Sequence, residues 1–135
     1  MLDSLLLLLV SAMIGIAVII FVANWKLFTK AGEEGWKSLI PIYNTYIKIN
    51  IAFNGSKNWL ISEVILSFFS GLIGIDTTLG LLMFLIATGI NLYVSYSFLR
   101  RYTDTWMSIL SLFFPVIIIP IVAFSNEYQY TEYVE

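Results

Sequence analysis

"SLLLLLVSAMIGIAVIIFVANW", residues 4–25, is a run of 22 residues without a charged side chain. An α-helix of this length is roughly 33 Å long, which is enough to cross a hydrocarbon core of about 30 Å. Asp3 stands before the run, where a secretory signal would carry basic residues, and no small-residue cleavage site followed by a polar chain comes after it. We therefore predict a permanent transmembrane helix here.

Three further apolar runs follow along the chain. Residues 77–99 and 105–126 carry no charge, whereas the shorter run 59–75 contains Glu63. The sequence thus predicts an all-α fold: an integral membrane four-helix bundle with an interfacial amphipathic helix between its first two spans. We expect a single membrane domain over residues 1–135, with spans at about 4–25, 59–75, 77–99 and 105–126.

The composition supports a membrane protein and excludes several kinds of chemistry. Hydrophobic residues make up 59% of the chain and charged residues 12%, whereas soluble proteins average about 45–50% and 25%. A small soluble domain could not hide so much apolar surface. Histidine and cysteine are absent, which excludes disulfides, thiol catalysis, imidazole bases and the usual zinc sites. We expect no metal or cofactor, and the net charge of −2 gives no reason to expect nucleic acid.

All basic residues fall in two segments between predicted spans. They are Lys26, Lys30, Lys37, Lys48 and Lys57 after the first span, and Arg100 and Arg101 after the third. With four spans these segments lie on one side, which the positive-inside rule makes cytoplasmic. Both termini are then extracytoplasmic, and both are acidic, with Asp3 at one end and Glu135 at the other. We predict a multi-pass protein of the bacterial cytoplasmic membrane.

The segment between the first two spans includes "KAGEEGWKSLIPIYN", residues 30–44. It is too apolar for a free loop, and Gly35 and Pro41 interrupt any long helix. We expect a short segment at 36–40, a kink at Pro41 and a helix over about 43–52. Together they would form a cytoplasmic interfacial segment at about 34–53, serving either to seal the bundle base or to bind a partner.

A weak internal repeat relates residues 27–40 to residues 98–110. Each copy runs from an apolar pair through basic and acidic residues to Trp-x-Ser, and a proline follows, at Pro41 and Pro115. The pattern fits a parallel duplication of two spans, and it also fits convergence on the same membrane-surface composition.

Two polar side chains are predicted to lie within the membrane. Glu63 is about one turn into its span, where Lys26 or Lys57 could pair with it, and either a structural role or proton handling would suit it. Asn91 is near the middle of its span, where an amide usually bonds a neighbouring helix. Asp76, before Thr77, is the expected N-cap of the third span.

The motif K-A-G-x-x-G-W-x-x-x-I-P-x-Y-N resembles that of a bacterial family of small polytopic membrane proteins of unknown function. The matching positions include Lys30, Gly32, Gly35, Trp36, Pro41, Tyr43 and Asn44. From the apolar pattern of the segment, we predict that these residues form an interfacial motif or partner surface. Relatives are sometimes labelled signal peptidase I. Such an enzyme needs a serine nucleophile and a lysine base on the outer side, whereas every lysine here is predicted to be cytoplasmic. We therefore expect no enzyme.

Three functions remain open from the sequence. The first is a small non-catalytic accessory or scaffold subunit of a larger membrane complex. The second is a protective protein, such as immunity against a peptide toxin, and the third is a small oligomeric transporter or channel that uses Glu63 and Asn91. The expected partners are the lipid bilayer and other membrane subunits or further copies of the chain.

Overall fold

The computed structural model describes residues 1–132, so Tyr133, Val134 and Glu135 lie outside the described part. Every regular element in residues 1–132 is helical, in the order α1 (Leu2–Lys30), η1 (Gly35–Leu39), α2 (Pro41–Phe53), η2 (Asn58–Ile61), α3 (Ser62–Ile73), α4 (Thr78–Leu99), α5 (Thr105–Phe113) and α6 (Pro115–Phe124). The all-α prediction is confirmed. Two helices, α1 and α4, are long and apolar enough to cross a membrane, which by itself favours a membrane location only weakly.

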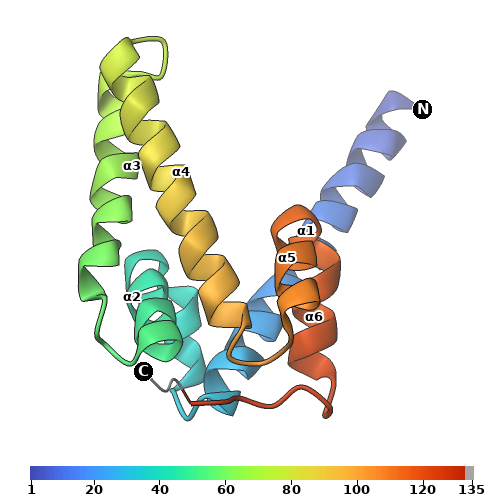
Figure 1. Cartoon of the computed structure of the whole chain (residues 1–135). Coiled ribbons are helices and arrows are strands. Elements are labelled where there is room, and N and C mark those ends of the chain that lie inside the picture. Colours follow the sequence, from blue (N-terminus) through green and yellow to red (C-terminus); the bar gives the residue numbers. More distant parts are fainter. Residues whose placement is uncertain (133–135) are drawn as a thin grey trace.

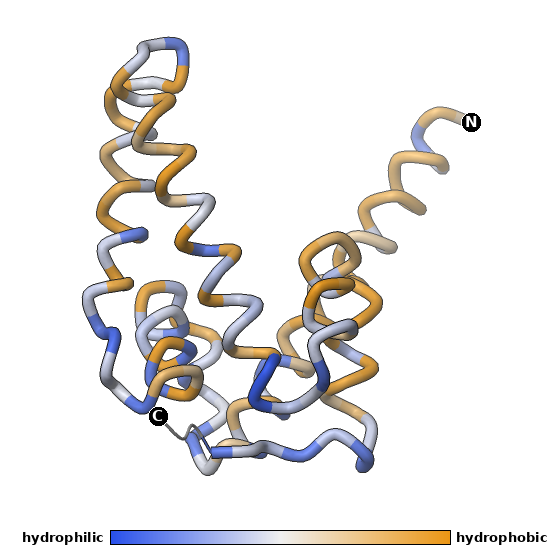
Figure 2. The backbone as a smooth tube through the Cα atoms, in the orientation of Figure 1, coloured by the Kyte–Doolittle hydropathy of each residue, from blue (hydrophilic) through white to orange (hydrophobic). Residues whose placement is uncertain are grey.

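Two helical arms rise from a common base (Figure 1). One arm is the N-terminal part of α1, and the other is the α3–α4 hairpin, while the remaining helices gather around the base. The arms are mostly hydrophobic, and hydrophilic residues concentrate toward the base (Figure 2). The core lies in the base and is formed by the C-terminal turns of α1 and α4 together with α2 and α6.

The first helix agrees with the predicted span but extends beyond it, from Leu2 to Lys30. Residues 2–19 are exposed, and only Ala23, Asn24, Leu27 and Phe28 are buried. An exposed apolar surface of this size in a monomer marks a contact with lipid or with a partner.

The segment after α1 follows the sequence prediction closely. The 3₁₀-helix η1 covers Gly35–Leu39, Pro41 occupies the first turn of α2, and α2 ends at Asn54 in a left-handed conformation (φ 51°). Proline is favoured at this place because the first turn of a helix needs no donor from it. The buried side chains of α2 pack against α4, so this helix is part of the core.

The α3–α4 hairpin forms as expected, with a short turn between the two helices. Thr77, and not the predicted Asp76, caps α4, because the Thr77 Oγ1 accepts a hydrogen bond from the Gly80 amide at 3.1 Å. The Ser70 hydroxyl donates to the carbonyl of Gly80 at 2.9 Å, and Gly74 in the turn has a φ of +92°. These contacts close the tip of the hairpin.

The run 105–126, predicted as the fourth span, does not form one continuous helix. The segment breaks at Phe114 (φ −129°, ψ 56°) into α5 and α6, which pack against each other as a hairpin (Figure 1). The 9- and 10-residue helices are only about 14 and 15 Å long, roughly half a hydrocarbon core. The physical cause is Pro115, which lacks an amide donor and disfavours a helical conformation at the residue before it.

Both ends of the α5–α6 hairpin therefore lie at the base. The chain after α6 runs back along it, and the Thr131 amide donates to the carbonyl of Arg101 at 2.6 Å. The described C-terminal tail thus lies beside a basic segment, and not at the opposite end of the molecule as the four-span expectation required.

The internal repeat corresponds to a repeated structural unit. Each half consists of a long helix, a short helix and a helix that begins with proline: α1–η1–α2 in the first half and α4–α5–α6 in the second. The packing is reciprocal, because α1 contacts α6 and α4 contacts α2. Phe28 and Phe98 meet edge to face with ring centroids 6.1 Å apart. This exchange of equivalent contacts favours duplication over convergence.

Candidate functional site

Lys30 fastens the C-terminal end of α6 to the end of α1. Its ammonium donates hydrogen bonds to the carbonyls of Val122, Ser125 and Tyr128 at 2.9, 2.9 and 2.7 Å. The last carbonyls of a helix lack partners within that helix, so Lys30 satisfies groups that would otherwise be exposed. The motif lysine thus stabilises the contact between the two halves.

Glycine is required at both motif positions, Gly32 and Gly35, by the local backbone geometry. Gly32 has a φ of +82°, a conformation that side chains other than glycine rarely adopt. Gly35 is buried, and a Cβ added there would lie 2.2 Å from Nε1 of Trp25. The close approach of η1 to α1 therefore depends on the absence of a side chain at Gly35.

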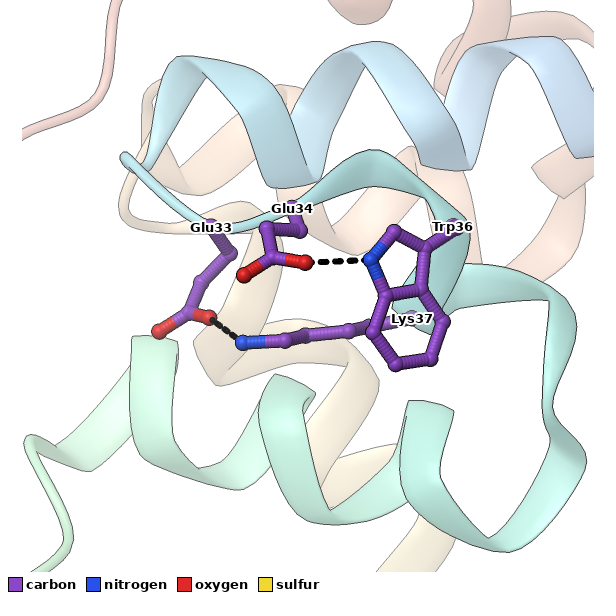
Figure 3. A network of polar contacts seen from close by, with 4 residues as sticks. All are labelled: Glu33, Glu34, Trp36 and Lys37. Carbon is purple, nitrogen blue, oxygen red and sulfur yellow. Dashed lines mark hydrogen bonds and ion pairs between the residues drawn. The ribbon is translucent and has the colours of Figure 1, made fainter.

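The aromatic part of the motif lies on the surface of η1 and α2. Trp36 is exposed, and its indole donates to the carboxylate of Glu34, while Lys37 forms an ion pair with Glu33 at 3.0 Å (Figure 3). Glutamates that the motif leaves unspecified thus hold two neighbouring side chains in place.

The rest of the motif splits between surface and core. The Tyr43 ring lies 6.1 Å from that of Trp36, and Pro41 opens α2. The Asn44 amide donates to the carbonyl of Ser38 at 2.5 Å. Of the predicted partner surface, Trp36 and Tyr43 form an aromatic face, whereas Lys30, Gly32, Gly35 and Asn44 hold the backbone together.

A second region, unforeseen in the sequence, is a cavity of about 210 Å³ that is lined by residues of α1, α2, α4, α5 and α6. Five polar side chains line it: Asn24, Lys48, Asn91, Ser95 and Ser111. Its remaining wall is apolar and consists of Leu92, Phe98, Leu99, Leu112, Pro115 and Ile119. Both halves of the repeat contribute to it, so the cavity exists only in the assembled base.

The structure brings Glu63 and Asn91 together. Glu63 is only 6% exposed; the Asn91 side chain interacts with it by hydrogen bonding, and the Lys48 ammonium acts on it electrostatically. Asn91 itself is exposed and reaches the cavity. Among the described residues, Glu63 forms no ion pair within 4 Å with Lys57 or Lys26. Lys57 donates to the Tyr93 hydroxyl at 3.1 Å, and Lys26 lies over the Phe124 ring.

Lys48 carries the positive charge of the cavity. Within residues 1–132 it forms no ion pair inside 4 Å, and its ammonium lies 5.5 Å from the centroid of the Phe98 ring. Burial lowers the pKa of Lys48 to about 8, and the Glu63 charge offsets part of that effect. A lysine whose charge is poorly compensated by the protein is suited to an anionic ligand.

Asn24 contributes an unused acceptor. The side chain is 8% exposed, and its amide nitrogen donates to the carbonyl of Ile20 at 3.0 Å. Its Oδ1 is buried and has no hydrogen-bond partner. An unsatisfied buried acceptor is costly, so this oxygen marks a position where a donor is missing.

The part of the chain that the structure describes offers no evident metal-binding site. Residues 1–132 contain no group of three acidic or other metal-ligating side chains.

The sequence pointed to Glu63 and Asn91 but not to Lys48, Ser95 and Ser111, which belong to three different helices. Ser111 lies beside α4 because α5, on which it stands, packs against α4.

The comparisons with known proteins give one result. A family model described as "Family of unknown function (DUF5684)" matches residues 36–133. No curated protein and no solved structure matches the chain. The matched range is more than half of the chain and includes the aromatic part of the motif and most of the cavity lining, whereas Lys30, Gly32 and Gly35 precede it.

Proposed function

Because this chain belongs to DUF5684, a family of unknown function, we propose from its own geometry that it is a small non-catalytic integral membrane protein and an accessory or scaffold subunit of a larger membrane complex. The lipid bilayer and other membrane helices are its partners. The K-A-G-x-x-G-W-x-x-x-I-P-x-Y-N motif serves as a structural signature that joins η1 and α6 to the end of α1.

The membrane placement that we propose has three spans and one re-entrant hairpin. The spans are α1, the continuous segment η2–α3, and α4, while α5 and α6 enter and leave on the side of the base. The basic segments lie at the base, which the positive-inside rule assigns to the cytoplasm. The N-terminus is then outside and the C-terminal tail inside, in place of the expectation that both termini are outside.

The observation that carries the scaffold proposal is the unoccupied face of α1. Ser11 and Gly15 are four residues apart on this exposed helix, and a Cβ at Gly15 would meet nothing within 4 Å. Small residues at this spacing let a second transmembrane helix approach closely. Since no other element in residues 1–132 covers this face, a helix from another chain is the partner it suits.

Affinity purification after mild detergent extraction at native expression tests this role. We expect a specific membrane protein to co-purify with the wild-type chain and to be lost with Gly15→Leu, because a larger side chain blocks close approach. Met13→Leu, at another exposed position of α1, is the matched control and should retain the partner. Recovery of the chain alone would count against the scaffold role.

Transport is the second candidate, and the cavity favours it. Glu63, Asn91 and Lys48 bring titratable and polar groups from three helices to one place, which is the arrangement found in proton and solute pathways. Glu63→Gln should then abolish proton-driven flux in proteoliposomes, and Glu33→Gln should leave it intact. Equal flux in wild type and Glu63→Gln would eliminate this route.

Peptidase activity is not expected even though the cavity contains both lysine and serine. In residues 1–132 no hydrogen bond joins the Lys48 ammonium to Ser95 or Ser111, and the Ser111 hydroxyl donates instead to the carbonyl of Ser108 at 2.6 Å. A nucleophilic serine needs its base within hydrogen-bonding reach. Cleavage of a preprotein by purified protein, abolished in Ser95→Ala or Ser111→Ala, would overturn the non-catalytic assignment.

A further inference from the structure

We propose that the cavity between the two halves binds the headgroup of an anionic phospholipid that carries a free hydroxyl, with its phosphodiester on Lys48 and its hydroxyl on Asn24. This inference goes beyond the scaffold role and does not depend on it.

The charge of the cavity selects an anion. Lys48 is the one charged side chain among the described residues that line it, and it forms no ion pair within 4 Å in residues 1–132. The nearest carboxylate that influences it, Glu63, is not among the lining residues and interacts with Asn91. A phosphodiester would supply the missing negative charge and accept a charge-assisted hydrogen bond.

The unused acceptor adds a second requirement. The Oδ1 of Asn24 needs a donor, and its own amide nitrogen is already bonded to Ile20. An ionised phosphodiester has no proton to give, so a hydroxyl on the same ligand has to provide the hydrogen bond. A headgroup that carries both a phosphodiester and a hydroxyl satisfies Lys48 and Asn24 together.

The walls of the cavity select an amphiphile. Apolar side chains from α4, α5 and α6 make up most of the lining, among them Phe98, Leu112 and Ile119. Leu92 and Pro115 belong to the lining and are also exposed, so the cavity reaches the surface between α4 and the break of the α5–α6 hairpin. Phe113, Phe114 and Val116, next to this opening, are exposed as well. Acyl chains can lie on this apolar surface while the headgroup is inside.

Ligand binding to purified protein in a neutral detergent tests the proposal, with native mass spectrometry or a thermal-shift titration as the readout. Phosphatidylglycerol should bind about tenfold or more tightly than phosphatidylcholine, because both carry the phosphodiester but the choline cation is repelled by Lys48 and offers no hydroxyl to Asn24. Phosphatidylmethanol, which has the phosphodiester but no headgroup hydroxyl, should bind more weakly than phosphatidylglycerol. Equal binding of phosphatidylglycerol and phosphatidylcholine would overturn the proposal without any variant.

Two variants and a soluble ligand complete the test. Lys48→Met should remove the preference for anionic lipid, and Asn24→Ala should remove the preference for phosphatidylglycerol over phosphatidylmethanol. Lys26→Met, outside the cavity lining, should change neither. If glycerol 3-phosphate binds as tightly as phosphatidylglycerol, the ligand is a soluble molecule and the lipid assignment is overturned. An unchanged lipid preference in a folded Lys48→Met protein would overturn it as well.

Discussion

The Tyr102 hydroxyl donates a hydrogen bond to the carbonyl of Leu27 at 2.6 Å. This bond joins the loop after α4 to the last turns of α1 and therefore connects the two halves of the repeat. Tyr102 is 4% exposed, and its burial raises the pKa of the phenol well above the ordinary value. The hydroxyl therefore stays protonated, and remains a donor, over the whole physiological range of pH.

Tyr102→Phe should lower the free energy of unfolding by about 1 kcal/mol, the typical net value of one hydrogen bond. The Leu27 carbonyl also accepts from the Ala31 amide, so the variant should still fold. Denaturant unfolding in detergent micelles measures the change. Tyr46→Phe is the control, since no hydrogen bond to the Tyr46 hydroxyl is found in residues 1–132 and its removal should have almost no effect.

Gly35→Ala should destabilise the base by about 1–3 kcal/mol, the usual cost of overpacking. The added methyl group would overlap the Trp25 indole, and either η1 or the indole has to move. Thermal unfolding and the fluorescence maximum of the tryptophans report on this displacement. Gly89→Ala introduces the same change in a helix where nothing lies within 4 Å and should be neutral or stabilising; similar effects at both positions would contradict the close contact.

Lys30→Met should release the C-terminal tail from the base. The ammonium bonds three carbonyls between Val122 and Tyr128, and their loss makes local opening more frequent. Limited chymotrypsin digestion should cut after Tyr128 or Tyr130 about tenfold faster than in wild type. Lys37→Met, whose ion pair lies on η1, should leave the rate unchanged, and an equal rate in both variants would argue against the anchoring role.

Cysteine labelling can decide between three spans with a re-entrant hairpin and four spans. The chain has no cysteine, so single cysteines can be introduced without background. In intact cells Ser4→Cys should react with an impermeant maleimide, and Asn126→Cys should react only after permeabilisation. Labelling of both residues from outside would restore the four-span arrangement and exclude the proposed placement.

The stability of the protein should rise with pH between about 8 and about 10.4 because of Lys48. Its pKa is about 8 in the folded protein and about 10.4 in an unfolded chain. The unfolded state binds more protons in this window, so raising the pH favours the folded state. Below pH 8 the cost of burying the charge is fully present. The difference between wild type and Lys48→Met should change by about 2 kcal/mol across the window, and a constant difference would show that Lys48 is not desolvated.

Sequence reasoning located most helices because their signals are local. The uncharged run 4–25 lies within α1, and Pro41 marks the start of α2 as expected. The same reasoning failed at Pro115, because hydropathy reports how apolar a segment is and not whether its chain direction reverses. A run of 22 uncharged residues is compatible with one long helix or with two short ones, and the packing of α5 on α6 decides between them.

The candidate site was only partly predictable for a related reason. Glu63 and Asn91 stand out as polar residues in apolar helices, and that signal requires no knowledge of the fold. In the sequence, Lys48 is one of several basic residues between the first two predicted spans, and Asn24 lies near the end of the uncharged run 4–25, so neither residue stands out. Their shared cavity depends on how α1 and α2 pack against the second half, which no spacing along the chain encodes.

The short length of the α5–α6 hairpin has a mechanical consequence. In the proposed placement this hairpin and α2 occupy only the leaflet on the side of the base, whereas three separate helices cross the other leaflet. The molecule is then a wedge whose cross-section is larger in the leaflet that contains the base. Many such wedges side by side bend the membrane toward the leaflet in which the cross-section is smaller. The protein should accordingly concentrate where the membrane is curved with the leaflet that contains the base on the convex side, and should be depleted where the curvature has the opposite sign.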